Sequence, residues 1–312
     1  MAIPTGSHTI TTNVEFIPEL WSDDIIAAYK TNLVVANLTT KITVDKGDKI
    51  HIPKPTRGSA SVKTAAAEVT LITESASEVA IDVDLHYEYS RLIDDILNVQ
   101  AIESYRAFYT NDAGYALAKT VEDQIIRNWE GLQGGTVQTA GSETWATAVI
   151  GGDGTTAYVD STTGNSTTLT DAGIRKMIQT LDDANVPQTE RALILPPVER
   201  NTLMGLARFT EQAFVGEAGP GNTIRTGMIG DIYGIKVYVT SNCFSHASAD
   251  FSTNHRVGAL LHKDALCYVE QQSVRSQSDY MQQFLATLFT ADCIFGVGEL
   301  RDDAGIAFVV PA

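Results

Sequence analysis

Cysteine, basic residues and long apolar runs are all scarce in this chain of 312 residues. Three widely separated cysteines, Cys243, Cys267 and Cys293, do not form the dense pattern of a disulfide framework, so we expect buried thiols in a reducing compartment. No stretch of about 18 apolar residues is present, so no membrane-spanning helix is expected. Residues 1–13 are polar and show no secretory signal. The protein is therefore expected to be made and used in solution, with no membrane partner.

Positive charge is outnumbered by negative charge. The 22 Lys and Arg residues stand against 38 Asp and Glu residues, a formal net charge of −16 at pH 7. Attachment to nucleic acid requires cations that neutralise phosphates, so a DNA-binding enzyme and a basic packaging protein are poor candidates. The apolar share of 44% is ordinary, and the length suits one large domain or two moderate ones with a sizeable core.

Motifs that carry common chemistry are also missing. The chain has neither a phosphate-binding P-loop sequence nor the Gly-x-Ser-x-Gly turn of α/β-hydrolases. Gly216, Gly219 and Gly221 do not match the Gly-x-Gly-x-x-Gly dinucleotide fingerprint, and we interpret 216–230 as a flexible loop. The sequence thus offers no catalytic residue and no cofactor-binding residue, and we expect that the protein is not an enzyme.

Two groups of potential metal ligands occur in the sequence. They are Asp82, Asp84, His86 and Glu88 in the first group, and Cys243, His246 and His255 in the second. The first group shares one side of an expected strand and is better explained as the polar face of a half-buried strand. The second group lacks the fourth ligand of a closed zinc site and is better explained as loop residues of mixed polarity. We therefore predict no metal and no other cofactor.

The spacing of apolar residues predicts few helices and many strands. Helical spacing occurs within 16–41, from Asp94 to Trp129, and in a segment that Thr170 can cap and that ends before Pro187. A further helix passes through Leu203 and Leu206. Short apolar or alternating runs predict strands at 192–195, 235–240, 257–261, 284–289, 294–297 and 306–310. Because no βαβ unit repeats, we expect an α+β fold.

The clearest strand pattern lies between residues 41 and 90. Apolar and polar residues alternate strictly from Val79 to Tyr89, which predicts one continuous strand with one apolar face. Ile50 and Ile52 alternate in the same way on an outgoing limb. The two limbs together predict a long two-stranded excursion. Since an isolated hairpin is only marginally stable in water, this one is expected to rest on its own domain or on a neighbouring subunit.

Three passages of the chain follow one another in a distinctive order. The first is FIPELWSDDIIAAYKTNLVVANL, and the second is a strand-rich arm that leads into ALAKTVEDQII. The third contains RALILPPVERNTLMGL, GMIGDIYGIKVYVTSN and LLHKDALCYVEQ, followed by a strand-rich tail. Their order and spacing, over nearly the whole chain, resemble the Hong Kong 97-like major capsid proteins of tailed bacteriophages.

This resemblance implies a division of the chain into the parts of that capsid fold. The parts are an N-terminal arm (1–41), an extended β-hairpin loop (42–92), a spine helix of the peripheral domain (93–132), an insertion rich in Gly, Ser and Thr (133–169), an axial domain (170–255), and the return strands of the peripheral domain (256–312). Trp145 and Tyr158 are the only large anchors of the insertion. The glycine-rich segment 216–230 is expected in or near the axial domain.

The resemblance also implies a function and partners. Subunits of this family assemble as hexamers and pentamers into an icosahedral shell around packaged double-stranded DNA. The chain is thus expected to be a structural virion protein, assembled in the host cytoplasm, that binds copies of itself. Portal, scaffold and cement proteins are further implied partners, and the DNA is enclosed without sequence-specific binding. A cellular nanocompartment shell of the same fold and a soluble enzyme of unknown chemistry are the alternatives.

Charge is divided between the two limbs of the expected hairpin. Residues 46–63 carry five basic residues and one acidic residue, a net charge of +4, whereas 64–95 carry one basic and eight acidic residues, a net charge of −7. Opposed patches suit head-to-tail docking of one subunit on the next. The candidate residues for this contact between subunits are Lys46, Lys49, Lys54, Arg57, Lys63, Glu68, Glu74 and Glu78. The alternative is that the limbs neutralise each other within one hairpin.

Overall fold

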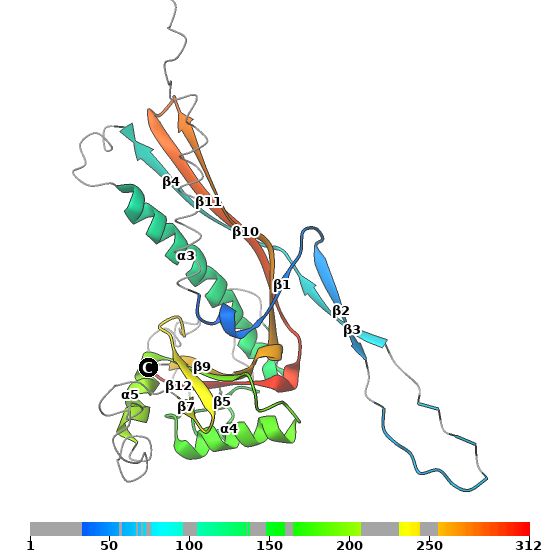
Figure 1. The fold of residues 1–312 in the computed structure, drawn as a ribbon. Coiled ribbons are helices and arrows are strands. Elements are labelled where there is room, and N and C mark those ends of the chain that lie inside the picture. The colour runs from blue at the N-terminus through cyan, green and yellow to red at the C-terminus, as the bar shows by residue number, and fades with distance from the viewer. Residues whose placement is uncertain are drawn as a thin grey trace, which may run out of the picture.

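The computed structural model describes residues 33–55, 58–66, 68–69, 71–72, 76–95, 105–135, 137, 148–159, 165–206, 231–243 and 255–312. In this part of the chain, a four-stranded sheet runs alongside a long helix, and a six-stranded sheet lies with shorter helices at one end of it (Figure 1). A two-stranded hairpin projects away from both sheets (Figure 1). This mixture of helices and strands confirms the predicted α+β class.

The four-stranded sheet has the strand order β1–β10–β11–β4. The strands are β1 (Thr40–Thr43), β10 (Leu266–Met281), β11 (Ala286–Glu299) and β4 (Leu85–Asp94). Strand β1 runs parallel to β10, and the other neighbours are antiparallel. One face of the sheet packs against helix α3 (Tyr105–Arg127), where Gln124 Nε2 donates a hydrogen bond to Tyr87 Oη at 2.9 Å. The sheet and the helix together form the elongated part of the molecule (Figure 1).

Helix α3 (Tyr105–Arg127) follows the predicted apolar stripe. Ala113, Leu117, Val121 and Ile125 lie on one side of the helix and are buried. The helix continues into the 3₁₀ segment η3 (Asn128–Gly134), which buries Trp129. The first part of the predicted helix, 96–104, lies outside the described residues. The described part confirms that the long helix supplies core contacts along its length.

The six-stranded sheet has the order β5–β12–β9–β6–β8–β7. The strands are β5 (Ile150–Gly151), β12 (Gly305–Pro311), β9 (His255–His262), β6 (Arg191–Leu195), β8 (Ile235–Val239) and β7 (Asp231–Ile232). All residues of β6 are buried, and β9 and β12 are buried almost throughout. Strands covered on both faces have continuous apolar runs, which explains why the sequence predicts the central strands correctly.

Two helices accompany the six-stranded sheet. Helix α4 (Asp171–Asp183) begins at the predicted cap, where Thr170 Oγ1 accepts a hydrogen bond from the backbone N–H of Gly173 at 3.0 Å. Helix α5 (Pro197–Gly205) begins with proline, whose missing N–H has no partner to lose in the first turn. A short 3₁₀ segment, η4 (Lys263–Ala265), joins β9 of this sheet to β10 of the other. The link fixes the relative direction of the two sheets.

The hairpin consists of β2 (Lys49–Pro55) and β3 (Ala76–Asp82), which are antiparallel. The prediction of one continuous strand from Val79 to Tyr89 is wrong, because the strand breaks at Val83 and Asp84. Beyond the break, β4 pairs with β11 and not with the outgoing limb of the hairpin. The predicted domain boundaries stay predictions, although this pairing places 85–92 in the four-stranded sheet.

The break escapes the sequence pattern because both sides of it bury every second residue. Ile81 and Val83 belong to a small apolar cluster with Cys267 and Val269 of β10. This cluster anchors the base of the hairpin to the four-stranded sheet. An apolar residue is therefore required both before the break and within it, and the alternation continues through the break.

The C-terminal strands are longer than predicted. The runs expected at 284–289 and 294–297 are parts of one region, in which β11 begins after a turn that contains Phe284. The sequence does not predict β10 as a strand of 16 residues. Its second half, 271–281, is mostly polar and exposed, because one face of this sheet is open. A strand that buries few side chains has few apolar residues, so the sequence pattern does not reveal it.

Some predictions fall outside the described residues. These are the helix expected within 16–41 up to residue 32, the anchor Trp145, and the glycine-rich segment 216–230. Within the predicted insertion, Tyr158 is buried and its ring lies edge-on to His255 at a centroid distance of 5.8 Å. Tyr158 is thus confirmed as an anchor that attaches the insertion to the six-stranded sheet.

Gly296 of β11 is predicted to be required where the hairpin leaves the sheet. A Cβ atom at position 296 would lie 2.3 Å from the carbonyl oxygen of Asp82. We expect Gly296→Ala to lower the free energy of unfolding by about 1–3 kcal/mol, because one strand must shift. Gly205→Ala is the control, since its Cβ would meet nothing within 4 Å. Equal denaturation midpoints for Gly296→Ala and the wild type would contradict this prediction.

Candidate assembly surfaces

The base of the hairpin is oriented by polar contacts between its own limbs. Lys49 Nζ lies 2.9 Å from Asp82 Oδ1, and His51 Nδ1 lies 3.0 Å from Glu78 Oε1. The hydrogen bond to Asp82 raises the pKa of Lys49. All of these side chains are at least half exposed. Exposed pairs are screened by water, so they align the limbs without adding much stability.

The residues predicted to join subunits fall into three groups. Lys49 and Glu78 are paired within the hairpin, as the alternative interpretation expects. Four others are exposed: Lys46, Lys54, Lys63 and Glu68. Two lie outside the described residues: Arg57 and Glu74. The structure brings part of the basic limb and part of the acidic limb together within one chain, and a role of these residues between subunits stays a prediction.

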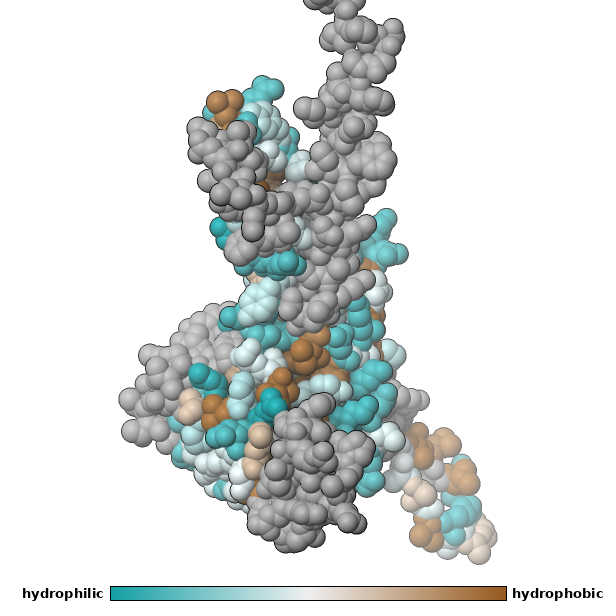
Figure 2. Space-filling model, turned by 60° about the vertical axis from the view of Figure 1, so that its left-hand side comes forward, coloured by the Kyte–Doolittle hydropathy of each residue, from teal (hydrophilic) through white to brown (hydrophobic). Residues whose placement is uncertain are grey.

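Large apolar side chains project from the far end of the hairpin. Val62 is 97% exposed, Leu71 is 85% exposed, and Val69 and Ile72 are each 63% exposed. The limbs lie close together here, since a Cβ atom added to Gly58 would lie 2.8 Å from Ile72 Cδ1. Figure 2 shows brown, apolar surface on this protrusion. Gathered apolar surface of this kind is typical of an interaction site. The sequence shows the residues but not that they are uncovered.

Glu122 of α3 is fully buried and connects three segments that are far apart in sequence. Its Oε1 accepts hydrogen bonds from the backbone N–H groups of Val34 and Val35, the latter at 2.8 Å. Its Oε2 accepts a hydrogen bond from the side-chain amide of Asn242, in the turn after β8. A buried carboxylate is tolerated when its oxygens are hydrogen bonded. Glu122 thereby fastens the end of the N-terminal region and the six-stranded sheet to the long helix.

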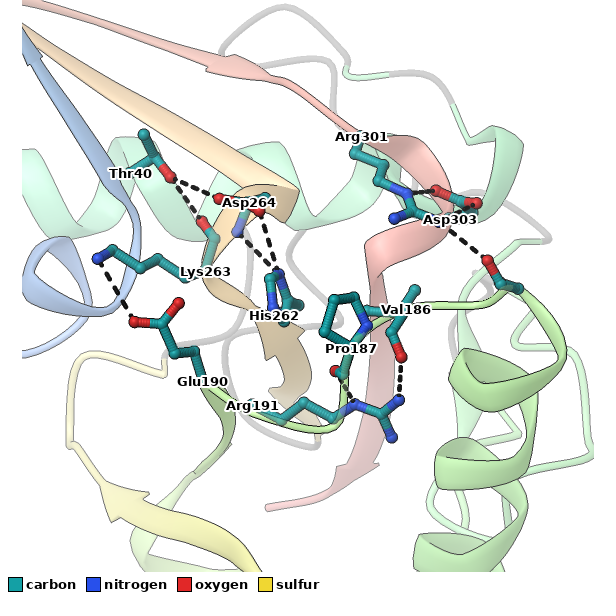
Figure 3. A network of polar contacts seen from close by, with 11 residues as sticks. Thr40, Val186, Pro187, Glu190, Arg191, His262, Lys263, Asp264, Arg301 and Asp303 are labelled. Carbon is teal, nitrogen blue, oxygen red and sulfur yellow. Dashed lines mark hydrogen bonds and ion pairs between the residues drawn. The ribbon is translucent and has the colours of Figure 1, made fainter. Parts of the chain in front are cut away.

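Polar contacts also hold the junction of the two sheets around η4 (Figure 3). Thr40 Oγ1, at the start of β1, donates to the carbonyl oxygen of Lys263 at 3.2 Å. Lys263 Nζ lies 3.7 Å from Glu190 Oε1. Arg191, which is 5% exposed, donates to the carbonyl oxygen of Val186 at 2.6 Å. These contacts place β1 and β6 on opposite sides of the link between the sheets.

A second polar group lies on the open face of the four-stranded sheet. Asp292 accepts hydrogen bonds from Arg275 Nε at 3.1 Å and Arg275 Nη2 at 2.9 Å, and its Oδ2 lies 3.2 Å from His86 Nε2. Burial acts in the opposite direction, but these partners lower the pKa of Asp292. His86 and Asp82, two residues of the first potential metal group, are thus engaged with Asp292 and Lys49. Within the described ranges, no cluster of three or more His, Cys, Asp or Glu residues is placed to hold a metal ion.

Glu299 lies where β11, η3 and the 3₁₀ segment η5 (Asp302–Ala304) meet. Burial raises the pKa of Glu299 to about 7, and the charge of Asp302 and a hydrogen bond to it act in the same direction. Asp302 Oδ1 also accepts a hydrogen bond from the backbone N–H of Gly134 at 2.7 Å. Glu299 therefore titrates near neutral pH in this junction.

The three cysteines are buried and carry free thiols, as the sequence predicts. Burial raises the pKa of Cys267 to about 11 and that of Cys293 to about 12, and it raises the pKa of Cys243 further. None of them is therefore a nucleophile at neutral pH. No helix among the described residues is long and apolar enough to cross a membrane.

Comparison of this structure with solved structures shows which class of proteins has the same fold. A chain from Mycobacterium phage Che8 is 20% identical, with a TM-score of 0.66 over 88% of this chain and 90% of the other. The capsid of cyanophage P-SCSP1u is 18% identical, with a TM-score of 0.65 over 89% and 88% of the two chains. A virus-like particle from Pyrococcus furiosus is 11% identical, with a TM-score of 0.55 over 94% and 99%.

The chain thus has the fold of shell-forming capsid proteins. More particularly, it has the Hong Kong 97-like fold of phage major capsid proteins, which confirms the fold expected from the three sequence passages. No protein-family model matches the sequence, and no curated protein matches it. The likeness therefore lies in the three-dimensional arrangement of the strands and helices.

Glu122→Gln is expected to destabilise the protein. The substituted amide keeps one acceptor oxygen and replaces the other with an N–H donor. This donor faces either the backbone N–H groups of Val34 and Val35 or the side-chain amide of Asn242, so two donors meet where a hydrogen bond was. We expect the free energy of unfolding to fall by about 1–3 kcal/mol at neutral pH, as measured by urea denaturation. The matched control is Asp123→Asn, because burial raises the pKa of Asp123 to about 6. A smaller loss for Glu122→Gln than for this control would contradict the role of Glu122.

Glu299 is predicted to make stability depend on pH. Its folded-state pKa of about 7 lies above the usual 4.5, so the folded state binds this proton more tightly than the unfolded chain does. The stabilisation is complete below the unfolded-state value and is lost as the pH rises through about 7. Asp123 adds a slope of the same sign. Urea denaturation across this range should show a flatter dependence for Glu299→Gln, and parallel curves would refute the assignment.

Proposed function

We propose that this chain is a structural subunit that assembles as hexamers and pentamers into an icosahedral shell enclosing double-stranded DNA. The observation that carries the proposal is the hairpin, whose far end leaves Val62, Val69, Leu71 and Ile72 in water. A two-stranded hairpin is marginal by itself, and this one has an apolar cluster only at its base. Another copy of the chain, resting under the hairpin, supplies the missing contacts.

Head-to-tail docking explains why the hairpin carries separated charges. A heterologous contact closes into a ring when each subunit is rotated relative to the previous one by a whole-number fraction of a full turn. Lys46, Lys54 and Lys63 remain exposed on or near the basic limb, and Glu68 remains exposed on the acidic side. We propose that these exposed side chains reach a second subunit, whereas Lys49 and Glu78 align the limbs. Complementary charge selects the register of the contact more than its strength.

The net charge of −16 supports enclosure of DNA without tight binding to it. A shell that neutralised phosphates at many positions would bind the DNA tightly to its inner surface. Portal, scaffold and cement proteins are part of the proposal as further partners, and the particle is the virion, assembled in the host cytoplasm. The chain acts as a building block in it and not as an enzyme.

A cellular nanocompartment is the second candidate, because a virus-like particle from Pyrococcus furiosus shares the fold. Its TM-score of 0.55 is lower than the 0.61–0.66 of the phage chains, which favours the phage shell. The contents separate the two candidates, since a compartment retains a cargo enzyme and a phage shell retains DNA. A soluble enzyme is the third candidate, and no residue of the sequence points to its chemistry.

Electron microscopy of the purified protein tests the proposed function. We expect rings, sheets or closed particles with local five-fold and six-fold arrangements. Particles from infected cells should contain nuclease-protected DNA, and a co-purifying enzyme in its place would favour the compartment. A protein that stays monomeric at every concentration, with the hairpin folded against its own domain, would overturn the proposal.

The charges of the hairpin can be tested by reversal and mixing. Lys54→Glu with Arg57→Glu should leave the subunit folded but block particle formation at physiological salt. Glu68→Lys with Glu74→Lys should block it equally. If the limbs pair between copies, a mixture of the two variants should again form six-membered rings, because each reversed limb then meets an opposite charge. Normal assembly of either variant alone would show that this charge contact is absent, and failure of the mixture would favour pairing within one hairpin.

A further inference from the structure

A polar hollow of about 430 Å³ lies beside the junction of the two sheets. Its walls come from the 3₁₀ segment η2 (Ala36–Leu38), the loop before β6, the strands β6 and β8, and η4. The volume is at the lower end of the roughly 300–1,000 Å³ that is typical of sites for small molecules. We call this site the junction hollow.

Two lysines of the junction hollow lie on either side of strand β6. In the strand order β9–β6–β8, Lys236 belongs to β8, and Lys263 directly follows the end of β9. Ala192 of β6 is in register with Lys236 on one side and with Leu261 on the other, so these residues share one face of the sheet. Neighbouring strands are about 4.8 Å apart, so the backbones that carry the lysines are separated by roughly 10 Å. Long, flexible side chains can reach a ligand between them.

The space between the lysines exists because the residue between them is small. Ala192 is 6% exposed, and its methyl group leaves room that a longer side chain would fill. Tyr238 follows Lys236 on the same face of β8 and is half-buried, and Leu38 of η2 lies on the opposite wall. The junction hollow therefore combines an apolar interior with positive charge, which suits a ligand that has a charged end and a less polar body.

The charges around the junction hollow are only loosely paired with one another. Glu190 is the one acidic residue among the described residues that line it, and Glu190 Oε1 lies 3.7 Å from Lys263 Nζ (Figure 3). This distance is too long for a hydrogen bond, and both side chains are close to half exposed or more. Arg191 adds no free charge, because its guanidinium donates to Asp182 Oδ1 at 2.7 Å and to the carbonyl oxygen of Val186. Lys263 can therefore turn toward a ligand at little cost.

We infer that the junction hollow binds a phosphate group, either as inorganic phosphate or as a small phosphate ester of mononucleotide size. Lys236, Lys263 and Glu190 give this site a net charge of +1, although the whole chain carries −16. Lysines on opposite sides of β6 favour a ligand whose oxygens point in several directions. The tetrahedral phosphate meets this condition better than a planar carboxylate does, and lysine is a common phosphate ligand because it acts as a point charge.

A phosphate bound in the junction hollow fastens parts of the chain that few contacts now join. It links β8 of one sheet to η4, which leads into the other sheet, and η2 closes the site from the N-terminal side. The contact from Thr40 Oγ1 to the carbonyl oxygen of Lys263 lies at the same junction. A ligand that binds only the folded chain stabilises it. The site lies within one subunit, so this inference does not depend on the proposed function.

Phosphorus NMR of the unassembled full chain tests the inference. Inorganic phosphate is titrated at constant ionic strength, with chloride as the balancing salt, and its resonance should broaden in a saturable way. Lys236→Gln with Lys263→Gln should weaken this binding by about tenfold or more, because two charge-assisted contacts are lost. The matched control is Lys46→Gln with Lys176→Gln, which changes the net charge equally at exposed positions elsewhere. The control should bind phosphate as the wild type does.

A second titration with deoxyadenosine monophosphate identifies the source of the phosphate group. Binding about tenfold or more tighter than that of inorganic phosphate would show that the body of an ester fills the hollow, and equal binding would show that the phosphate group alone is held. Both results support the inference.

The melting temperatures of the same proteins exclude effects on folding and general salt effects. In chloride, the variant with both lysines replaced should melt with the wild type, and Lys236→Gln alone takes its place if it does not, because Lys236 is exposed on β8. Phosphate stabilises many proteins by exclusion from their surface. An equal rise in melting temperature for all three proteins, without saturable broadening, would therefore overturn the inference. Equal weakening of binding in the control would overturn it too, because charge in general would then attract the phosphate.

Discussion

The contact between helix α3 and the four-stranded sheet is the interaction on which the other parts of the structure depend. Val121 and Ile125 pack on the side of the helix that faces the core, and Glu122 beside them binds the backbone at Val34 and Val35. Apolar packing therefore sets the position of the helix, and one buried carboxylate attaches the neighbouring segments to it. Without the packing, that carboxylate would lose both its position and the donors that offset its burial.

Apolar surface is distributed unevenly over the molecule. Some parts of it stabilise the fold, and others remain exposed. One continuous core joins α3 to both sheets, and a small cluster holds the base of the hairpin. The far end of the hairpin and the end of the long sheet contribute to neither. A subunit with such uncovered ends is stable as a fold but incomplete as a surface. Shell proteins need this combination, because the same chain must fold alone and then bind its copies.

The sequence predicts the parts of the fold that depend on local patterns. Thr170 as a helix cap, the buried strand at 192–195 and the apolar stripe of α3 each follow from spacing that short-range physics sets. The break at Val83 could not be predicted, because alternation continues through it while the pairing partner changes. Strand β10 was missed because an open sheet face lets half of it remain polar. The role of Glu122 depends on contacts between residues far apart in the chain, for which a single sequence gives no periodic signal.

The burial of the thiols affects how the protein responds to an oxidising environment. Cys243, Cys267 and Cys293 are enclosed by the core of each subunit and stay protonated in neutral water. The proposed shell, built from such subunits, can leave a reducing cell for an oxygenated environment without forming disulfides. Its durability outside a cell then rests on packing and on the number of copies, and not on thiols that oxygen could convert.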